Sequence, residues 1–191
     1  MAGKQAKLLS ELNVVQMLEL ISRNRYPDRD RVVLLLSVKA GLRAGEIANL
    51  TWPMVLDSEG RVGPVIELYD RAAKKCSGRS IPINPDLKKA LVALSKASDG
   101  QGTVVRSERG GPMRPNSIIN WFGKYYRQLG LQGCSSHSGR RTFITNAARK
   151  VHMAGGSLRD VQQLAGHRSL NMTQVYIEGD TEAKRRLVAL L

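Results

Sequence analysis

Cysteine is scarce in this sequence: Cys76 and Cys134 are the only two among 191 residues. Two thiols form neither a network of disulfides nor the ligand spacing of a structural zinc site. Small disulfide-stabilised folds and zinc modules are therefore excluded, and the cysteine content fits a reducing interior.

Long apolar runs are also missing. The longest, residues 32–42, is interrupted by Lys39 and is well short of the roughly 20 residues that cross a bilayer. Residues 1–7 lack the apolar segment of a secretion signal. We expect a cytoplasmic protein that does not enter a membrane.

Acidic residues are few relative to basic ones, 16 against 30, which gives a formal net charge of +14. The imbalance is strongest in residues 101–168, which hold eleven Lys and Arg but two Asp and Glu. Such a surface attracts a polyanion. The 42% of apolar residues is ordinary for a folded protein, so we expect one compact domain over residues 1–191.

Three common phosphate and metal motifs are absent. There is no G-x-x-x-x-G-K-[ST] loop, no G-x-G-x-x-G after a strand, and no carboxylate cluster near the basic region that would hold magnesium. We therefore expect no cofactor and no metal ion, and a metal-dependent nuclease is disfavoured.

Apolar periodicity predicts a mainly helical chain. The expected helices cover residues 8–22, 30–40, 44–50, 86–96, 115–129, 137–150, 158–165, 170–177 and 181–191. Short β-rich runs at 52–56, 64–69 and 79–83 predict a sheet of three strands. The expected fold class is α+β: mainly α with a small three-stranded antiparallel β-sheet.

Two arginines, Arg43 in GLRAGEIANL and Arg140 in HSGRRTF, are candidates for binding a phosphate. A guanidinium stays protonated at any workable pH, and its planar fork matches phosphate oxygens. A pair could neutralise the charge that develops during attack on phosphorus. Taken singly, Arg43 could instead be the ion-pair partner of Glu46, and Arg140 one more solvated base beside Arg141.

Two of the three histidines accompany these arginines. His137 lies three residues before Arg140, which places both on one helical face, and His167 ends the LAGH motif. A phosphate shared with the arginines would explain both positions, whereas a lone histidine is more often a packed or surface residue. His152 is the remaining one.

Tyr176 is the candidate nucleophile among five tyrosines. A phenol ionises near pH 10, so at neutral pH it needs nearby positive charge or a proton acceptor to react. Tyr176 follows His167 by nine residues, beyond a short polar turn that could bring it to the cations. Without that context it would be a partly buried aromatic. Tyr125 and Tyr126 fall in an amphipathic helix and are expected to pack.

Lys74 and Lys75 share a loop between two β-rich runs. A flexible ammonium there could protonate a departing oxygen, or it could simply contact a nucleic-acid backbone. The residues alone leave this choice open.

These motifs, in this order, resemble those of the tyrosine recombinase catalytic domain of the phage integrase family: GLRAGEIANL, KKCSGRSIPI, HSGRRTF, LAGH and VYI. The resemblance covers roughly residues 8–191. It implies that family's fold, double-stranded DNA as partner, and site-specific recombination through a 3′-phosphotyrosyl intermediate without cofactor or metal. It also implies a homo-oligomer on DNA, expected to be a tetramer, from a chain that can be monomeric in solution.

The resemblance also implies roles for single residues. Tyr176 would be the nucleophile, and Arg43 and Arg140 would bind the non-bridging oxygens of the scissile phosphate. Lys74 rather than Lys75 matches the lysine that protonates the leaving oxygen.

His137 and His167 would position the phosphate and assist proton transfer, and Glu46 matches an acidic position that supports the site. The sequence departs from the family at Gly139, where leucine is usual, and we expect this to loosen packing beneath Arg140.

Few residues precede Leu8, so we expect the family's N-terminal core-binding domain to be absent, because the chain is either an excised piece or naturally short. Without that domain, which would complete a clamp around the DNA, DNA binding should be weak and strongly salt-dependent. Residues 181–191 resemble an exchanged C-terminal helix, although they could equally fold back on their own core.

Two other functions remain open from the sequence. A type IB topoisomerase-like enzyme would use the same chemistry but return each strand to its own partner. A DNA-binding module without catalytic activity is the second. The presence of every catalytic residue type favours an enzyme.

Overall fold

The computed structural model describes residues 5–70, 72, 78–98, 100–176, 185, 188 and 189. The α-helices in this part of the chain are α1 (Glu11–Ile21), α2 (Pro27–Lys39), α3 (Ala44–Asn49), α4 (Pro85–Ser95), α5 (Pro115–Gln128), α6 (Ser138–Lys150), α7 (Leu158–Ala165) and α8 (Leu170–Gln174). These helices confirm the predicted ones, with boundaries that differ by no more than three residues. The helix predicted over 181–191 lies mostly outside the described residues.

Helix α2 is the centre of the fold. It begins at Pro27, whose fixed φ suits the first turn of a helix, and its residues 32–36 are all buried. A helix buried on every face must be covered by neighbours on all sides. Helices α1, α3, α4 and α6 pack against it.

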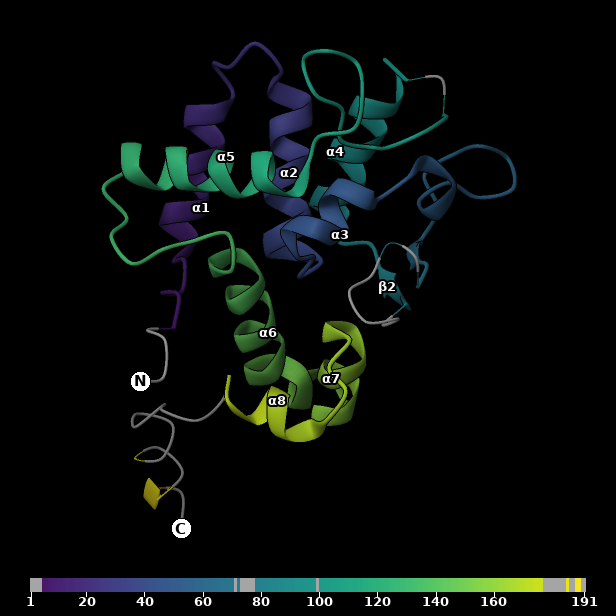
Figure 1. The fold of residues 1–191 in the computed structure, drawn as a ribbon. Coiled ribbons are helices and arrows are strands. Elements are labelled where there is room, and N and C mark those ends of the chain that lie inside the picture. Colours follow the sequence, from purple (N-terminus) through teal and green to yellow (C-terminus); the bar gives the residue numbers. More distant parts are fainter. Residues whose placement is uncertain are drawn as a thin grey trace.

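The apolar core has two parts joined by α6. The larger cluster lies around α2 and includes α5, whereas the smaller one consists of residues from α6 and α7, namely Ile144, Ala148, Val161 and Ala165. Figure 1 shows α6 running from the group that contains α1, α2 and α5 toward α7 and α8. Side chains at the start of α6 therefore lie where the two parts meet.

The predicted three-stranded sheet is wrong in its strand count. In the described part of the chain, β1 (Val65–Leu68) and β2 (Arg79–Pro82) form a two-stranded antiparallel sheet. The first predicted strand is instead a 3₁₀ turn, Trp52–Met54, because Pro53 has no N–H for a ladder and the Val55 N–H turns back to the Trp52 carbonyl, 2.8 Å away. What remains of pairing there is one isolated bridge, Leu56 to Val62.

Within the described residues, no helix has both the length and the apolar character needed to span a membrane.

The prediction that Gly139 loosens the packing beneath Arg140 is wrong. A Cβ atom at Gly139 would lie 2.3 Å from Ser37 Oγ and 2.9 Å from Ser37 Cβ. The missing side chain thus lets α6 approach α2 closely, and the leucine usual in the family could not fit in this arrangement. Ser37 Oγ is buried and has no hydrogen-bond partner in the described structure.

Replacing Gly139 by alanine should lower the free energy of unfolding by about 1–3 kcal/mol, because an extra methyl group must be forced into a filled contact. The double variant Ser37→Ala/Gly139→Ala should recover part of this loss, since it removes the nearest atom. Urea unfolding measures both. Gly45→Ala is the matched control: nothing lies within 4 Å of a Cβ there, so Gly139→Ala and Gly45→Ala with equal stability would contradict the close contact.

Candidate active site

Five of the six predicted catalytic residues line one cavity of about 440 Å³. They are Arg43, His137, Arg140, His167 and Tyr176. The sixth, Lys74, lies outside the described residues. Folding thus brings together side chains that are up to 133 positions apart in the sequence.

Each of these residues sits at the end of a helix or in its first turn. Arg43 is the N-cap of α3, His137 is the N-cap of α6, and Arg140 lies in the first turn of α6. His167 follows Gly166, which ends α7 in the left-handed conformation at φ +61°. Tyr176 comes two residues after α8. Four helix ends, those of α3, α6, α7 and α8, meet around one cavity, which explains why short motifs mark the site.

Arg140 is fixed by backbone oxygens from both parts of the fold. Its Nη1 donates to the Gly41 carbonyl at 2.6 Å and its Nη2 to the Ala165 carbonyl at 2.5 Å, and the residue is 4% exposed. Burial and, next, the nearby charge of Arg43 lower the pKa of Arg140 to about 10. The guanidinium is still protonated at neutral pH, so the site holds a desolvated, fixed cation.

Glu46 binds Arg43 and a further arginine, Arg79. Its Oε1 accepts from Arg43 Nη1 at 2.7 Å and from Arg79 Nη1 at 3.1 Å, and its Oε2 accepts from the Arg43 backbone N–H at 2.9 Å. Burial alone would raise the pKa of Glu46, but the hydrogen bonds and charges of Arg79 and Arg43 outweigh it and lower that pKa. Arg43 therefore forms the ion pair with Glu46 and also faces the cavity.

The charges in this cluster do not balance. Three guanidinium groups, those of Arg43, Arg79 and Arg140, lie near one another, and the described carboxylate that acts on all three is that of Glu46. The described cluster is thus left with an excess of positive charge in a largely desolvated place, which favours binding of an anion.

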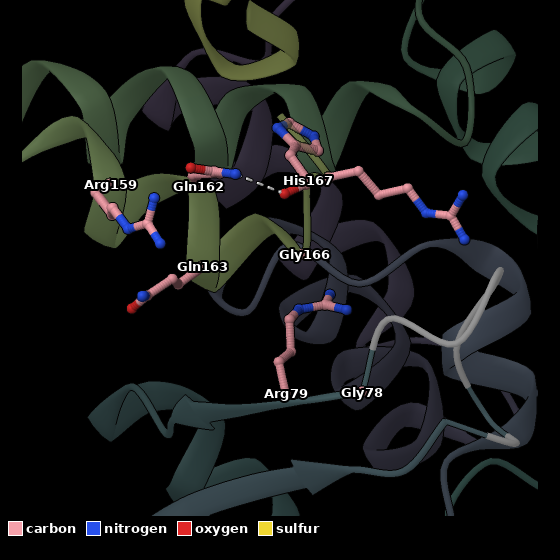
Figure 2. Close-up of a pocket in the computed structure, with 8 residues that line it drawn as sticks. Gly78, Arg79, Arg159, Gln162, Gln163, Gly166 and His167 are labelled. Atoms are coloured by element: carbon pink, nitrogen blue, oxygen red, sulfur yellow. Dashed lines mark hydrogen bonds between the residues drawn. The ribbon is translucent and has the colours of Figure 1, made fainter. Parts of the chain in front are cut away.

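His167 is held by its neighbours and is neutral. Its Nδ1 lies 2.9 Å from Thr173 Oγ1, and its backbone carbonyl accepts from Gln162 Nε2 at 3.0 Å (Figure 2). Burial, followed by the charges of Arg140 and Arg43, lowers the pKa of His167 to about 4. At neutral pH the imidazole can accept a proton at a ring nitrogen.

Tyr176 lies directly beside His167. The two rings are stacked with centroids 5.5 Å apart and planes 23° from parallel. The Tyr176 ring also packs on the smaller apolar cluster, while its backbone N–H donates to the Thr173 carbonyl at 3.0 Å. The phenol of Tyr176 therefore lies next to both a neutral base and the cationic cluster.

The other tyrosines with a clear packing role are Tyr125 and Tyr126. Both are buried in α5, where Tyr125 contacts the Trp121 ring and Tyr126 stacks on Phe122. Burial raises the pKa of Tyr126, which makes it less reactive. This confirms their predicted packing role.

Arg79 and Thr173 were not predicted as parts of the site. In the sequence Arg79 opens a β-rich run and Thr173 belongs to a short polar turn. Their spacing to Glu46 and His167 follows no local periodicity, so only the tertiary structure reveals these contacts. In the described residues, no group of three or more His, Cys, Asp or Glu side chains is placed to hold a metal ion.

Comparison with known proteins gives a match to one family over most of the chain. A sequence model described as "Phage integrase family" matches residues 7–183. Tyrosine recombinase XerC of Mesorhizobium japonicum is 30% identical over 158 residues, which cover 80% of this chain and 47% of the relative. Tyrosine recombinase XerA of Pyrococcus furiosus is 29% identical over 174 residues, covering 89% and 56%. The chain spans about half the length of the curated relatives it matches.

Solved structures share the fold. The Tn1549 transposon integrase in complex with a circular intermediate DNA superposes with a TM-score of 0.75 at 20% identity, covering 100% of this chain and 67% of the integrase. A crystal structure of XerA recombinase gives a TM-score of 0.73 at 22% identity, covering 100% and 65%. The arrangement of the helices and of the small antiparallel sheet is therefore shared with these recombinases and integrases.

An NMR titration of the histidine rings tests the electrostatics of the cavity. His167 should stay neutral down to about pH 4. Inorganic phosphate should raise its pKa, because an anion stabilises the imidazolium. Since the lowered pKa belongs to the folded state, the stability that depends on His167 should fall between about pH 6.5 and 4 as the unfolded chain takes up the proton first.

His→Gln variants at positions 137, 152 and 167 assign the three signals. A His167 ring that titrates at 6.5 or above without any added anion would contradict the desolvated, cationic environment.

Proposed function

The chain belongs to the phage integrase family, and we propose that it cleaves and rejoins DNA at specific sites as the catalytic part of a tyrosine recombinase. The observation that supports this most is the single cavity that contains Arg43, Arg140, His167 and Tyr176. It combines fixed cations, a neutral base and a phenol, which is the set that phosphodiester cleavage by a tyrosine needs.

In the proposed cleavage step, Oη of Tyr176 attacks the phosphorus of one DNA strand. A bond forms between the phenolic oxygen and phosphorus, and the bond from phosphorus to the 5′-oxygen breaks. The products are a 3′-phosphotyrosyl link and a strand that leaves as a 5′-hydroxyl after taking a proton, which we assign to Lys74. The reverse attack by a 5′-hydroxyl restores a phosphodiester, so the exchange needs no external energy source.

Arg43 and Arg140 would hold the two non-bridging oxygens. Arg140 is already fixed by two carbonyls and Arg43 by Glu46, so little reorganisation is required when charge develops on the phosphate. Hydrogen bonds from a guanidinium to phosphate oxygens are among the strong ones in proteins. Preorganised cations of this kind stabilise the transition state more than the ground state.

His167 is our candidate to accept the phenolic proton. Its lowered pKa keeps it neutral at neutral pH, and it stacks on the ring of Tyr176. Negative charge on a bound phosphate would raise the pKa of His167 and so favour the transfer. His137, which lines the same cavity at the N-cap of α6, would help to position the phosphate.

Double-stranded DNA is the proposed partner, in keeping with the basic charge of residues 101–168. Exchange between two duplexes involves four strands, and each protomer offers one Tyr176. We therefore propose a homo-oligomer of four protomers on DNA.

Covalent trapping on DNA tests this proposal. The protein is incubated with a randomised pool of nicked duplexes, from which the short cleaved end diffuses away and leaves the enzyme attached. Tyr176 should carry the adduct in peptide mapping, and sequencing of the trapped strands should identify the site. Tyr176→Phe should lose the adduct, because it lacks the nucleophilic oxygen, whereas Tyr69→Phe, a change on an exposed tyrosine outside the cavity, should keep it.

An adduct on another residue would refute the assignment of Tyr176. DNA binding with no adduct would favour the DNA-binding module. Relaxation of supercoiled DNA without recombinant products would favour the topoisomerase-like activity.

A further inference from the structure

Arg79 projects from the start of β2 toward α7. Figure 2 shows its side chain between the strand and Gly166, on the side of the chain opposite the His167 ring. The side chain is 6% exposed. A Cβ at Gly166 would lie 2.9 Å from Arg79 Nη1, so the glycine that ends α7 also leaves the space that this guanidinium occupies.

One guanidinium connects three elements of the fold. Its Nε donates to the Leu164 carbonyl of α7 at 2.8 Å, and Nη1 and Nη2 donate to the two oxygens of Glu46 in α3 at 3.1 and 3.2 Å. Two parallel bonds fix the plane of the carboxylate as well as its position. The same two oxygens also accept hydrogen bonds from Nη1 and the backbone N–H of Arg43. The orientation of Arg43 therefore depends on a carboxylate that Arg79 holds in place.

We propose that Arg79 is a positioning residue that couples the β1–β2 hairpin to Arg43 and His167 in the catalytic cavity. This deepens the proposed function and rests on it. The segment between the two strands contains Lys74 in the sequence. A shift of the hairpin when DNA binds would move the Glu46 carboxylate through Arg79, and with it the phosphate-binding guanidinium of Arg43.

The electrostatics of His167 support this coupling. The charged groups that act on it are Arg140 from α6, Arg43 from the N-cap of α3 and Arg79 from β2. Its ring contacts Thr173 of α8 and Tyr176, which follows α8. Arg79 is one of the three cations that lower the pKa of His167. Removing Arg79 should therefore change the pKa of His167, although the two side chains are not in contact.

The test compares Arg79→Gln and Arg79→Lys with the control Arg127→Gln in the full chain. Arg127 is exposed on α5 and lines no part of the cavity. Two quantities are followed by NMR: the pKa of His167 and the affinity for inorganic phosphate, read at the signals of His167 and Arg43. Arg127→Gln should leave both unchanged.

Arg79→Gln should raise the pKa of His167 and weaken phosphate binding roughly 10- to 100-fold, by analogy with the loss seen when groups that orient metal ligands are removed. Arg79→Lys keeps the charge but lacks the planar fork that places two parallel N–H groups on the oxygens of Glu46. It should keep the pKa of His167 near that of the wild type and still lose phosphate affinity.

Two results would overturn the proposal. If both Arg79 variants behave like Arg127→Gln, Arg79 has no influence on the cavity. If Arg79→Lys retains full phosphate affinity, only the charge of residue 79 matters, and the planar guanidinium does not position Glu46 or Arg43. Should Arg79→Gln fail to fold, Arg79→Lys alone decides between these outcomes.

Neither measurement uses the chemistry of Tyr176. A failure to trap a covalent adduct would therefore refute the proposed cleavage without affecting the result for Arg79, and the reverse also holds.

Discussion

The carboxylate of Glu46 is the interaction on which the cationic face of the cavity depends. It is 1% exposed and binds the side chains of two arginines and one backbone N–H. Without it, the partly buried Arg43 and the buried Arg79 would lose the carboxylate that binds both of them, which is unfavourable. With it, one negative charge holds both guanidinium groups in fixed directions and still leaves the neighbourhood of Arg140 positive. A single buried acid therefore organises a site for an anion without neutralising it.

The lowered pKa values in the cavity have one common origin. Burial and mutual repulsion lower the pKa of Arg140 to about 10 and that of His167 to about 4. Both groups thus bind a proton less tightly than they would in water, and the negative charge of a bound phosphate would raise both pKa values. Assembling these charges lowers the stability of the fold. In return the cations are already in place before an anion binds, which is the preorganisation that the proposed phosphoryl transfer requires. Arg140 links this electrostatic arrangement to the architecture, because its two carbonyl partners belong to the two parts of the fold that α6 joins.

The sequence predicted the helices well because their signals are local. Ser10, for example, caps α1 through a reciprocal pair of 3.1 Å hydrogen bonds with Asn13, only three residues along the chain. The strand predicted at 52–56 failed for a reason that was visible in part, since Pro53 cannot donate to a ladder. The predicted effect of Gly139 on packing had the wrong direction, because its contact with Ser37 joins two helices about a hundred residues apart in the sequence. Arg79 was missed for the same reason: the carboxylate that it binds is 33 positions away. The cavity residues and the pairing of Arg43 with Glu46 could be named from motifs, but the contacts that fix Arg140 and His167 could not.

The central claim is that the guanidinium groups of Arg43 and Arg140 hold a DNA phosphate beside Tyr176. A crystal structure of the Tyr176→Phe variant with the duplex recovered by covalent trapping tests this most directly. The account predicts non-bridging oxygens of one phosphate at hydrogen-bond distance, roughly 2.7–3.2 Å, from both guanidinium groups, with the phenyl ring of residue 176 facing the phosphorus. A duplex bound with its phosphates outside this cavity, and both arginines still turned to protein atoms alone, would contradict it.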